Sequence, residues 1–240
     1  MYEIKKIKKY DFLGESTPNK CTIGFNNSNL IKTIVFDLGG VFFTNGTYYA
    51  VDKIQKQWNI KNRRLVEFFF GNNPASEGNL VRLGLITMDE FEDSVSRKLC
   101  IPDSEKRLIR ELWFSSYTPN YLMEDVVKTL SRQYRLIVFS GNIKERIEYL
   151  DDRYDFLKYF DEYLFSYDYQ IHKGDKEFYY ELINCVDCDP ENALLIDDSQ
   201  SHIDHAESLG LKGIKYTSTE QMLSEFQKYN INMFVNIYNT

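Results

Sequence analysis

The chain has 240 residues, of which 43% are hydrophobic and 15% aromatic, enough for one main core and a second, smaller module. Its formal net charge of −7 provides no basic surface of the kind that binds nucleic acid. No apolar run reaches the roughly 18 residues of a membrane span, and the first residues lead into no apolar signal segment. We therefore expect a cytoplasmic globular protein that binds neither nucleic acid nor a membrane.

The first residues differ from those that follow. Residues 1–30 predict an N-terminal extension with little helical periodicity, which could add an edge strand. The apolar run Ile34–Phe36, closed by Asp37, is typical of a strand in a parallel sheet that is covered on both faces. We expect an α/β core formed by residues 31–45 and 116–240.

Residues 46–115 carry apolar side chains at helical spacing with no clear strand between them, which predicts an inserted helical cap. The expected helices are Tyr48–Trp58, Arg63–Phe70, Met88–Leu99 and Ser104–Trp113. The aromatic residues expected to pack between them are Phe68, Phe69, Phe70, Trp113 and Phe114. Substrate choice should lie in the cap, where Arg63, Arg64 and Arg82 could meet a second anionic group, although most arginines are simply solvated.

Strands and helices alternate in the rest of the chain, after one further helix at 120–132. The predicted strands are 134–140, 162–166, 193–197 and 212–216. The predicted helices are 143–154, 175–186, 201–209 and 218–229. This alternation implies an α/β fold with a three-layer, Rossmann-like, mostly parallel sheet, whose binding site lies beyond the carboxyl ends of the strands.

Several polar residues stand at those predicted strand ends. Asp37, Ser140 and the pair Asp197-Asp198 each close an apolar run, and Lys173 follows a polar turn. Taken singly, each fits an ordinary turn, helix cap or solvated residue. Together, and in this order, they supply the nucleophile, hydroxyl, cation and acidic pair that phosphoryl transfer needs.

These residues and their neighbours resemble the haloacid dehalogenase (HAD) superfamily of hydrolases. The matching motifs are Phe36–Val41, Ser140–Asn142, Lys173 and Asp197–Gln200, and the resemblance extends over roughly residues 32–216. It is strongest for the branch with a helical cap between the first two motifs, which includes epoxide-hydrolase-associated phosphatase domains and sugar-phosphate phosphatases. A HAD-like fold with a cap is therefore implied.

The resemblance also implies the chemistry. Asp37 would be the nucleophile that forms an aspartyl-phosphate, and Lys173 would stabilise the transferring group. Mg²⁺ would be held by Asp37, the Gly39 carbonyl, Asp198 and, through water, Asp197. The residues implied to bind the substrate are Leu38, Gly39, Ser140, Gly141, Asn142 and Lys173. The implied activity is hydrolysis of a small phosphate monoester, such as a sugar phosphate or a nucleotide.

One departure from the family pattern affects catalysis. Gly39 stands where family phosphatases carry a second aspartate, which protonates the leaving group and then activates water. Its absence should slow the reaction without necessarily abolishing it, and an acidic leaving group, a water or a cap residue could replace it. Gly39 argues against a phosphomutase, and the acidic pair argues against a metal-free dehalogenase. The alternative is a catalytically impaired member that acts as a binding or scaffold module.

Two other patterns carry less weight. His202 and His205 are spaced like zinc ligands on a helix, but no cysteine or carboxylate partners stand at ligand spacing. Cys185 and Cys188 form a C-x-x-C without a second pair, which favours coincidence over a redox or metal site. The oligomeric state is left open by the sequence.

Overall fold

The computed structural model describes residues 30–233. The expected extension at residues 1–30 therefore lies almost wholly outside the described residues, together with its possible edge strand. No helix in the described range is long and apolar enough to cross a membrane.

A five-stranded sheet forms the centre of the molecule, with strand order β3-β2-β1-β4-β5 and parallel pairing throughout. The strands are β1 (Thr33–Phe36), β2 (Arg135–Ser140), β3 (Glu162–Phe165), β4 (Ala193–Asp197) and β5 (Lys212–Lys215). Each predicted strand is found within one or two residues of its expected bounds. The parallel sheet is confirmed, and it brings the carboxyl ends of β1, β2 and β4 to one edge.

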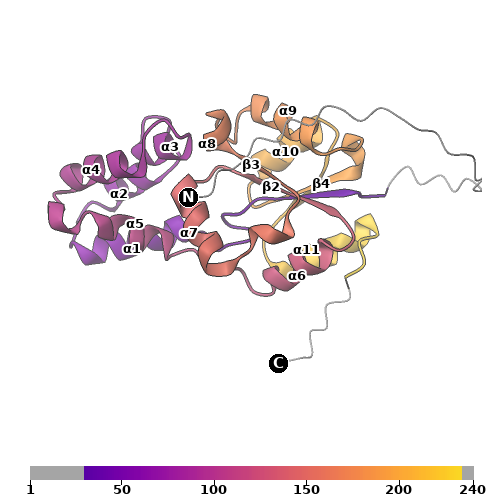
Figure 1. Cartoon of the computed structure of the whole chain (residues 1–240), viewed down its shortest axis with the longest axis horizontal. Helices are drawn as coiled ribbons and strands as arrows, with labels where there is room; N and C mark the ends of the chain where they lie inside the picture. Colours follow the sequence, from indigo (N-terminus) through magenta and orange to yellow (C-terminus); the bar gives the residue numbers. More distant parts are fainter. Residues whose placement is uncertain (1–29, 234–240) are drawn as a thin grey trace, which may run out of the picture.

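Helices cover both faces of this sheet, which makes three layers (Figure 1). These helices are α6 (Met123–Leu130), α7 (Lys144–Tyr154), α8 (Ser166–Tyr169), α9 (Lys176–Cys185), α10 (Gln200–Ser208) and α11 (Thr219–Phe226). Alternate residues of β1 face opposite sides: Ile34 packs in one buried cluster with Val126 of α6, and Val35 packs in another with Phe178 of α9. The predicted α/β fold is confirmed.

Five further helices lie between β1 and α6 in the sequence and gather beyond one end of the sheet in Figure 1. They are α1 (Gly46–Gln57), α2 (Arg63–Phe70), α3 (Glu77–Arg82), α4 (Met88–Leu99) and α5 (Arg107–Phe114). The buried ring of Phe70 lies 5.3 Å from that of Phe91 and 4.7 Å from that of Trp113 between ring centroids. The aromatic residues therefore pack as expected, except Phe68, which is exposed. The exact limits of the cap stay a prediction.

Helix α3 was not anticipated by the sequence. Its six residues follow Asn72-Asn73-Pro74, a stretch with the composition of a loop, and they are too few to show helical periodicity. The helix forms because the Ser76 side chain accepts a hydrogen bond from the amide of Asn79, which caps its first turn. Four short 3-10 turns complete the described chain, at Asp103–Glu105, Leu157–Tyr159, Pro190–Asn192 and Gln227–Tyr229.

Candidate active site

The polar residues singled out in the sequence meet at the carboxyl edge of the sheet. Ser140 and Asp197 are the last residues of β2 and β4, and Asp37 directly follows β1, which lies between them. Lys173 reaches them from the loop between α8 and α9. Its Nζ lies 2.8 Å from Oδ1 of Asp37 and 2.6 Å from Oδ2 of Asp197. The chain thus joins a cation to two carboxylates from neighbouring strands.

All three of these charged groups are buried, which shifts their pKa values. Burial would lower the pKa of Lys173, but the charges of Asp197 and Asp37 outweigh it and raise that pKa, so the ammonium stays protonated. Burial raises the pKa of Asp37 despite the attraction of Lys173. For Asp197, burial is outweighed by Lys173 and by the side chain of His202, which together lower its pKa to about 2.

The carboxylates themselves form a cluster that suits a divalent cation. Asp37, Asp197 and Asp198 each place one oxygen within 4.8 Å of the others. Desolvation, followed by the charges of Asp37 and Asp197, raises the pKa of Asp198 to about 6. Three carboxylates face a single ammonium, so negative charge is left over, and an oxygen-only donor set is the kind that Mg²⁺ prefers. The residues present therefore fit a magnesium ion.

The turn after Asp37 approaches this cluster closely. Gly40 has φ +92°, and a Cβ there would lie 2.2 Å from Oδ2 of Asp198, so only glycine fits. At Gly39 the nearest atom to an added Cβ is Cε1 of Tyr117, at 3.7 Å. Within the described chain, the amides of Leu38 and Gly39 donate no hydrogen bond, which leaves both available to an anion.

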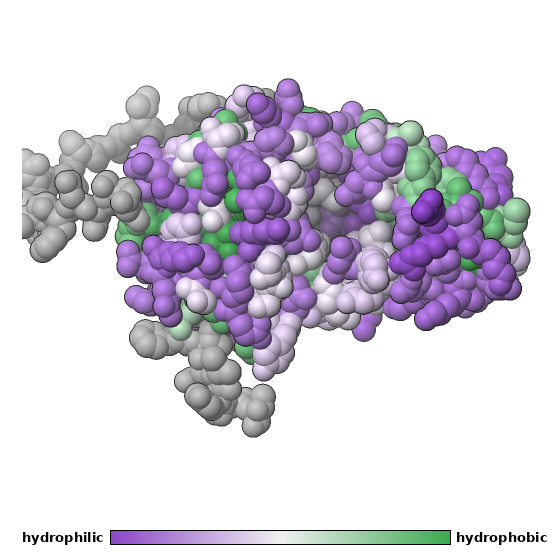
Figure 2. All heavy atoms as spheres, turned by 180° about the vertical axis from the view of Figure 1, so that it is seen from behind, coloured by the Kyte–Doolittle hydropathy of each residue, from purple (hydrophilic) through white to green (hydrophobic). Residues whose placement is uncertain are grey.

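A cavity of about 400 Å³ opens above this edge, between the strand ends and the cap helices. Figure 2 shows the molecule from behind, with hydrophilic side chains in the recess between its two parts. The sequence-predicted site residues that line the cavity are Asp37, Gly39, Ser140, Gly141, Asn142, Lys173 and Asp198. Leu38 has a fully buried side chain, and Asp197 lies behind Lys173, so neither lines the cavity.

Other cavity residues were not singled out by the sequence. Arg146 and Tyr117 line the cavity, and so does Ser166, whose buried hydroxyl has no hydrogen-bond partner in the described structure. The sequence offers one signal for Arg146, which stands one helical turn after Asn142 of the second motif. In the structure, its Nε donates to the Asn142 Oδ1 at 2.7 Å. Nothing in the local sequence marks Tyr117 as part of a site.

The three cap arginines have different environments. Arg63 binds Glu67 at 2.7 Å and Asp52 at the surface, and Arg64 is exposed, so neither lines the cavity. Arg82 is buried and does line it, contrary to the solvated position that is usual for arginine.

The histidine and cysteine patterns do not add a metal site. Nδ1 of His202 lies 2.9 Å from Oδ1 of Asp197, whereas the ring of His205 packs against that of Tyr179, with 5.4 Å between centroids. Cys188 contacts Thr33, the first residue of β1, at 3.6 Å, and therefore lies at the opposite edge of the sheet from Asp37.

Comparison with known proteins agrees with this geometry. A model of haloacid dehalogenase-like hydrolases matches residues 31–210. An uncharacterized protein of Dictyostelium discoideum is 26% identical over 216 residues, covering 86% of this chain and 91% of that protein. The structure is similar to that of a HAD-like family hydrolase from Porphyromonas gingivalis, with a TM-score of 0.67 and 19% identity, covering 85% of this chain and 100% of that one.

Two further solved structures have a similar fold. A HAD family enzyme of Bacteroides thetaiotaomicron, in complex with magnesium and inorganic phosphate, has a TM-score of 0.67 and 23% identity, with 82% of this chain and 99% of that one covered. An L-2-haloacid dehalogenase from Xanthobacter autotrophicus has a TM-score of 0.58 and 13% identity, with 85% of each chain covered. Because the family model matches most of the sequence, this chain belongs to the haloacid dehalogenase-like hydrolase family.

Proposed function

We propose that the protein is a magnesium-dependent phosphatase that hydrolyses a small phosphate monoester, such as a sugar phosphate or a nucleotide, through an aspartyl-phosphate on Asp37. The observation that carries the proposal is the contact of Lys173, which lines the cavity, with both Asp37 and Asp197, at 2.8 and 2.6 Å. The Bacteroides enzyme of similar fold, which binds magnesium and inorganic phosphate, supports it.

In the first step, a carboxylate oxygen of Asp37 forms a bond to phosphorus while the bond from phosphorus to the leaving oxygen breaks. Magnesium, held by Asp37, Asp198, the Gly39 carbonyl and, through water, Asp197, would offset the repulsion between the carboxylate and the phosphate. Lys173, the Ser140 hydroxyl and the free amides after Asp37 would bind the phosphate oxygens. Gly141 and Asn142 complete the proposed substrate contacts along the second motif.

In the second step, water attacks the phosphorus of the aspartyl-phosphate, the bond to Asp37 breaks, and inorganic phosphate is released. Gly39 offers no carboxylate to protonate the leaving group or to activate this water. General acid–base help is worth roughly 10²–10⁴-fold, so turnover should be slow for alkyl esters and faster for esters of acidic phenols. The proposed function therefore predicts a strong dependence of rate on the acidity of the leaving group.

The test is hydrolysis of p-nitrophenyl phosphate with added Mg²⁺, because its leaving group needs no proton. We expect activity that a chelator abolishes and that Asp37→Asn lowers by about 10³-fold or more. Asp125→Asn, which alters an exposed aspartate of α6, is the matched control and should retain full activity.

A second measurement separates an enzyme from a binding or scaffold module of the same fold. The phosphatase should form a Mg²⁺-dependent beryllofluoride adduct on Asp37, detectable by ¹⁹F NMR, because beryllofluoride imitates a phosphoryl group on a carboxylate. Absence of both hydrolysis and adduct, or hydrolysis that survives Asp37→Asn unchanged, would overturn the proposed function.

A further inference from the structure

Two buried arginines, Arg82 and Arg146, lie in the helical wall of the cavity and have no counterion among the described residues. Arg82 is 7% exposed and Arg146 is 1% exposed, and both line the cavity. Within residues 30–233, no carboxylate oxygen lies within the 4.0 Å of an ion pair from either guanidinium. Arginine is almost never fully buried unless it is paired, because removing a charge from water is costly. The two positive charges are therefore unbalanced within the described structure.

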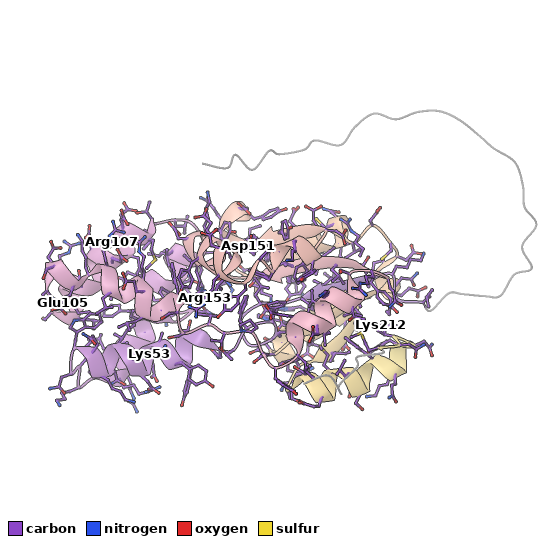
Figure 3. The ribbon with its side chains drawn as sticks, turned by 60° about the horizontal axis from the view of Figure 1, so that its bottom comes forward. Lys53, Glu105, Arg107, Asp151, Arg153 and Lys212 are labelled. Atoms are coloured by element: carbon purple, nitrogen blue, oxygen red, sulfur yellow. The ribbon has the colours of Figure 1, made fainter. Side chains whose placement is uncertain are left out.

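Other arginines of the chain show the usual arrangement. Arg107, labelled at the outer end of the cap helices in Figure 3, is more than half exposed and lies 2.8 Å from Asp89. Arg110 binds both Asp89 and Glu92, each at 2.5 Å. The cap thus supplies carboxylates for arginines at its surface and none for Arg82, which lines the cavity.

Arg82 is held in place by neutral partners. Its Nη1 donates to the carbonyls of Gly78 at 2.6 Å and Gly71 at 3.0 Å, and its Nη2 donates to the carbonyl of Phe70 at 2.9 Å. These carbonyls fix its orientation but carry no net charge. Burial, together with repulsion from Arg146, lowers the pKa of Arg82 to about 9, so it keeps its charge at neutral pH.

Arg146 has a donor that is not used. Its Nε donates to Asn142, but its Nη1 is buried without a partner in the part of the chain that the structure describes. Its guanidinium lies over two rings, 4.4 Å from the centroid of Tyr117 and 5.1 Å from that of Trp113. The Arg82 guanidinium also lies 5.1 Å from the Trp113 centroid, so the two cations are neighbours around one indole ring. Ring faces stabilise a cation only partly, and an unmade buried hydrogen bond is costly.

We propose that Arg146, supported by Arg82, binds a second anionic group of the substrate, a carboxylate or a further phosphate on the leaving-group portion of the ester. The inference rests on the proposed function and specifies its substrate class. We call Asp37, Asp197, Asp198 and Lys173, at the carboxyl edge of the sheet, the floor of the site. A divalent cation and Lys173 would balance the charges of the three carboxylates there. Within the described structure, neither arginine forms an ion pair with Asp37 or Asp198.

The cavity has room for such a ligand. Its volume of about 400 Å³ lies within the roughly 300–1,000 Å³ typical of small-molecule pockets. A planar guanidinium suits the oxygens of a carboxylate or phosphate group, and Nη1 of Arg146 has no other partner among the described residues. A monoester with one anionic group would bind at the floor and leave Nη1 of Arg146 without a hydrogen-bond acceptor. A doubly anionic ester would bind at the floor with one group and accept from Arg146 with the other.

The test compares esters that differ in the second anionic group. One pair is 3-phosphoglycerate and glycerol 3-phosphate, which differ in a carboxylate, and the other is fructose 1,6-bisphosphate and fructose 6-phosphate, which differ in a phosphate. We expect kcat/KM to be roughly tenfold or more higher for the doubly anionic member of at least one pair. The pair that shows the preference identifies the anion, and p-nitrophenyl phosphate reports the proposed function alone.

The variant Arg146→Met should remove this preference, because it should lower kcat/KM about tenfold more for the doubly anionic member of the pair than for the singly anionic member. An unpaired buried charge replaced by an apolar chain of similar length should leave the fold intact. Arg153→Met is the matched control, because Arg153 lies on the same helix α7 but is exposed, and it should keep the preference. A thermal shift with each ester and Mg²⁺ on Asp37→Asn gives the same comparison without turnover.

The outcomes separate the two proposals. Hydrolysis of p-nitrophenyl phosphate without preference in either pair, and without a larger thermal shift for the doubly anionic members, overturns the second anion site and leaves the phosphatase standing. Equal loss on every substrate in Arg146→Met also overturns it, since Arg146 would then serve the transferring phosphate. No hydrolysis of any ester overturns the phosphatase, while the thermal shifts still decide the anion site.

Discussion

The floor and the wall of the cavity carry opposite unbalanced charges, and they are built in different ways. Asp37, Asp197 and Asp198 gather because neighbouring parallel strands end at one edge, and Lys173 offsets only part of their charge. The wall is formed by helices, and its arginines have no acidic partner in the described chain. The charge of the floor is therefore balanced only when a cation binds, and the charge of the wall only when an anion binds. The two proposals therefore assign the catalytic and selective ends of the substrate to separate parts of the fold.

Replacing Lys173 should have the largest effect on activity and stability, because its ammonium is the cation that pairs with Asp37 and Asp197. We expect Lys173→Met to lower kcat by about 10³-fold or more, and to lower the free energy of unfolding without metal by about 3–5 kcal/mol, since buried carboxylates are left unpaired. Added Mg²⁺ should recover part of the stability, because it binds the same carboxylates. Urea unfolding without Mg²⁺ measures the loss of stability, and unfolding with Mg²⁺ measures its recovery.

The control for that variant is Lys176→Met, which removes an exposed lysine three residues later, at the start of α9. It should leave activity and unfolding unchanged. If Lys173→Met were as stable as the wild type without metal, the floor would not depend on an internal cation, and the contrast with the wall would be lost.

A second, smaller effect is expected at the turn that supports Asp198. Gly40→Ala places a Cβ against the Asp198 carboxylate at a left-handed φ, so the carboxylate must move. We expect about a tenfold or greater loss of Mg²⁺ affinity, measured by titration calorimetry. Gly39→Ala is the matched control, because its φ is not left-handed and its new methyl group meets only Tyr117 at 3.7 Å. Equal loss in both variants would contradict the role of this close approach.

The two sides of the cavity also differ in how far the sequence predicts them. The floor was predicted because each residue directly follows a run of apolar strand residues, and the register of a parallel sheet then decides where Asp37, Ser140 and Asp197 meet. The predicted sheet and most predicted helices were confirmed for the same reason, since local periodicity specifies both. Lys173 lies in a loop, so no strand pattern places it, and it was singled out by the polar turn before it and by the family resemblance.

The wall could not be predicted in this way because it depends on tertiary packing. From the sequence alone, Arg82 is expected to be a solvated arginine. It is buried because α3 forms and brings its guanidinium to the carbonyls of Phe70 and Gly71. Arg146 is marked in the sequence only by its spacing from Asn142, and its burial results from packing against Trp113 and Tyr117, which are distant in the sequence. No local pattern reports such a contact.

The smallest effect is expected from restoring a carboxylate at Gly39, where family phosphatases carry an aspartate. Its backbone accepts a side chain, and an added Cβ has ordinary contact with Tyr117, so Gly39→Asp should fold and project a carboxyl group into the cavity. We expect about a tenfold gain in kcat for alkyl esters, which need a proton donor, and almost none for p-nitrophenyl phosphate. Gly39→Asn has the same size without the acid and should give no gain. If the asparagine variant gained equally, the missing carboxylate would not limit turnover, and the proton would be supplied from the wall or from water.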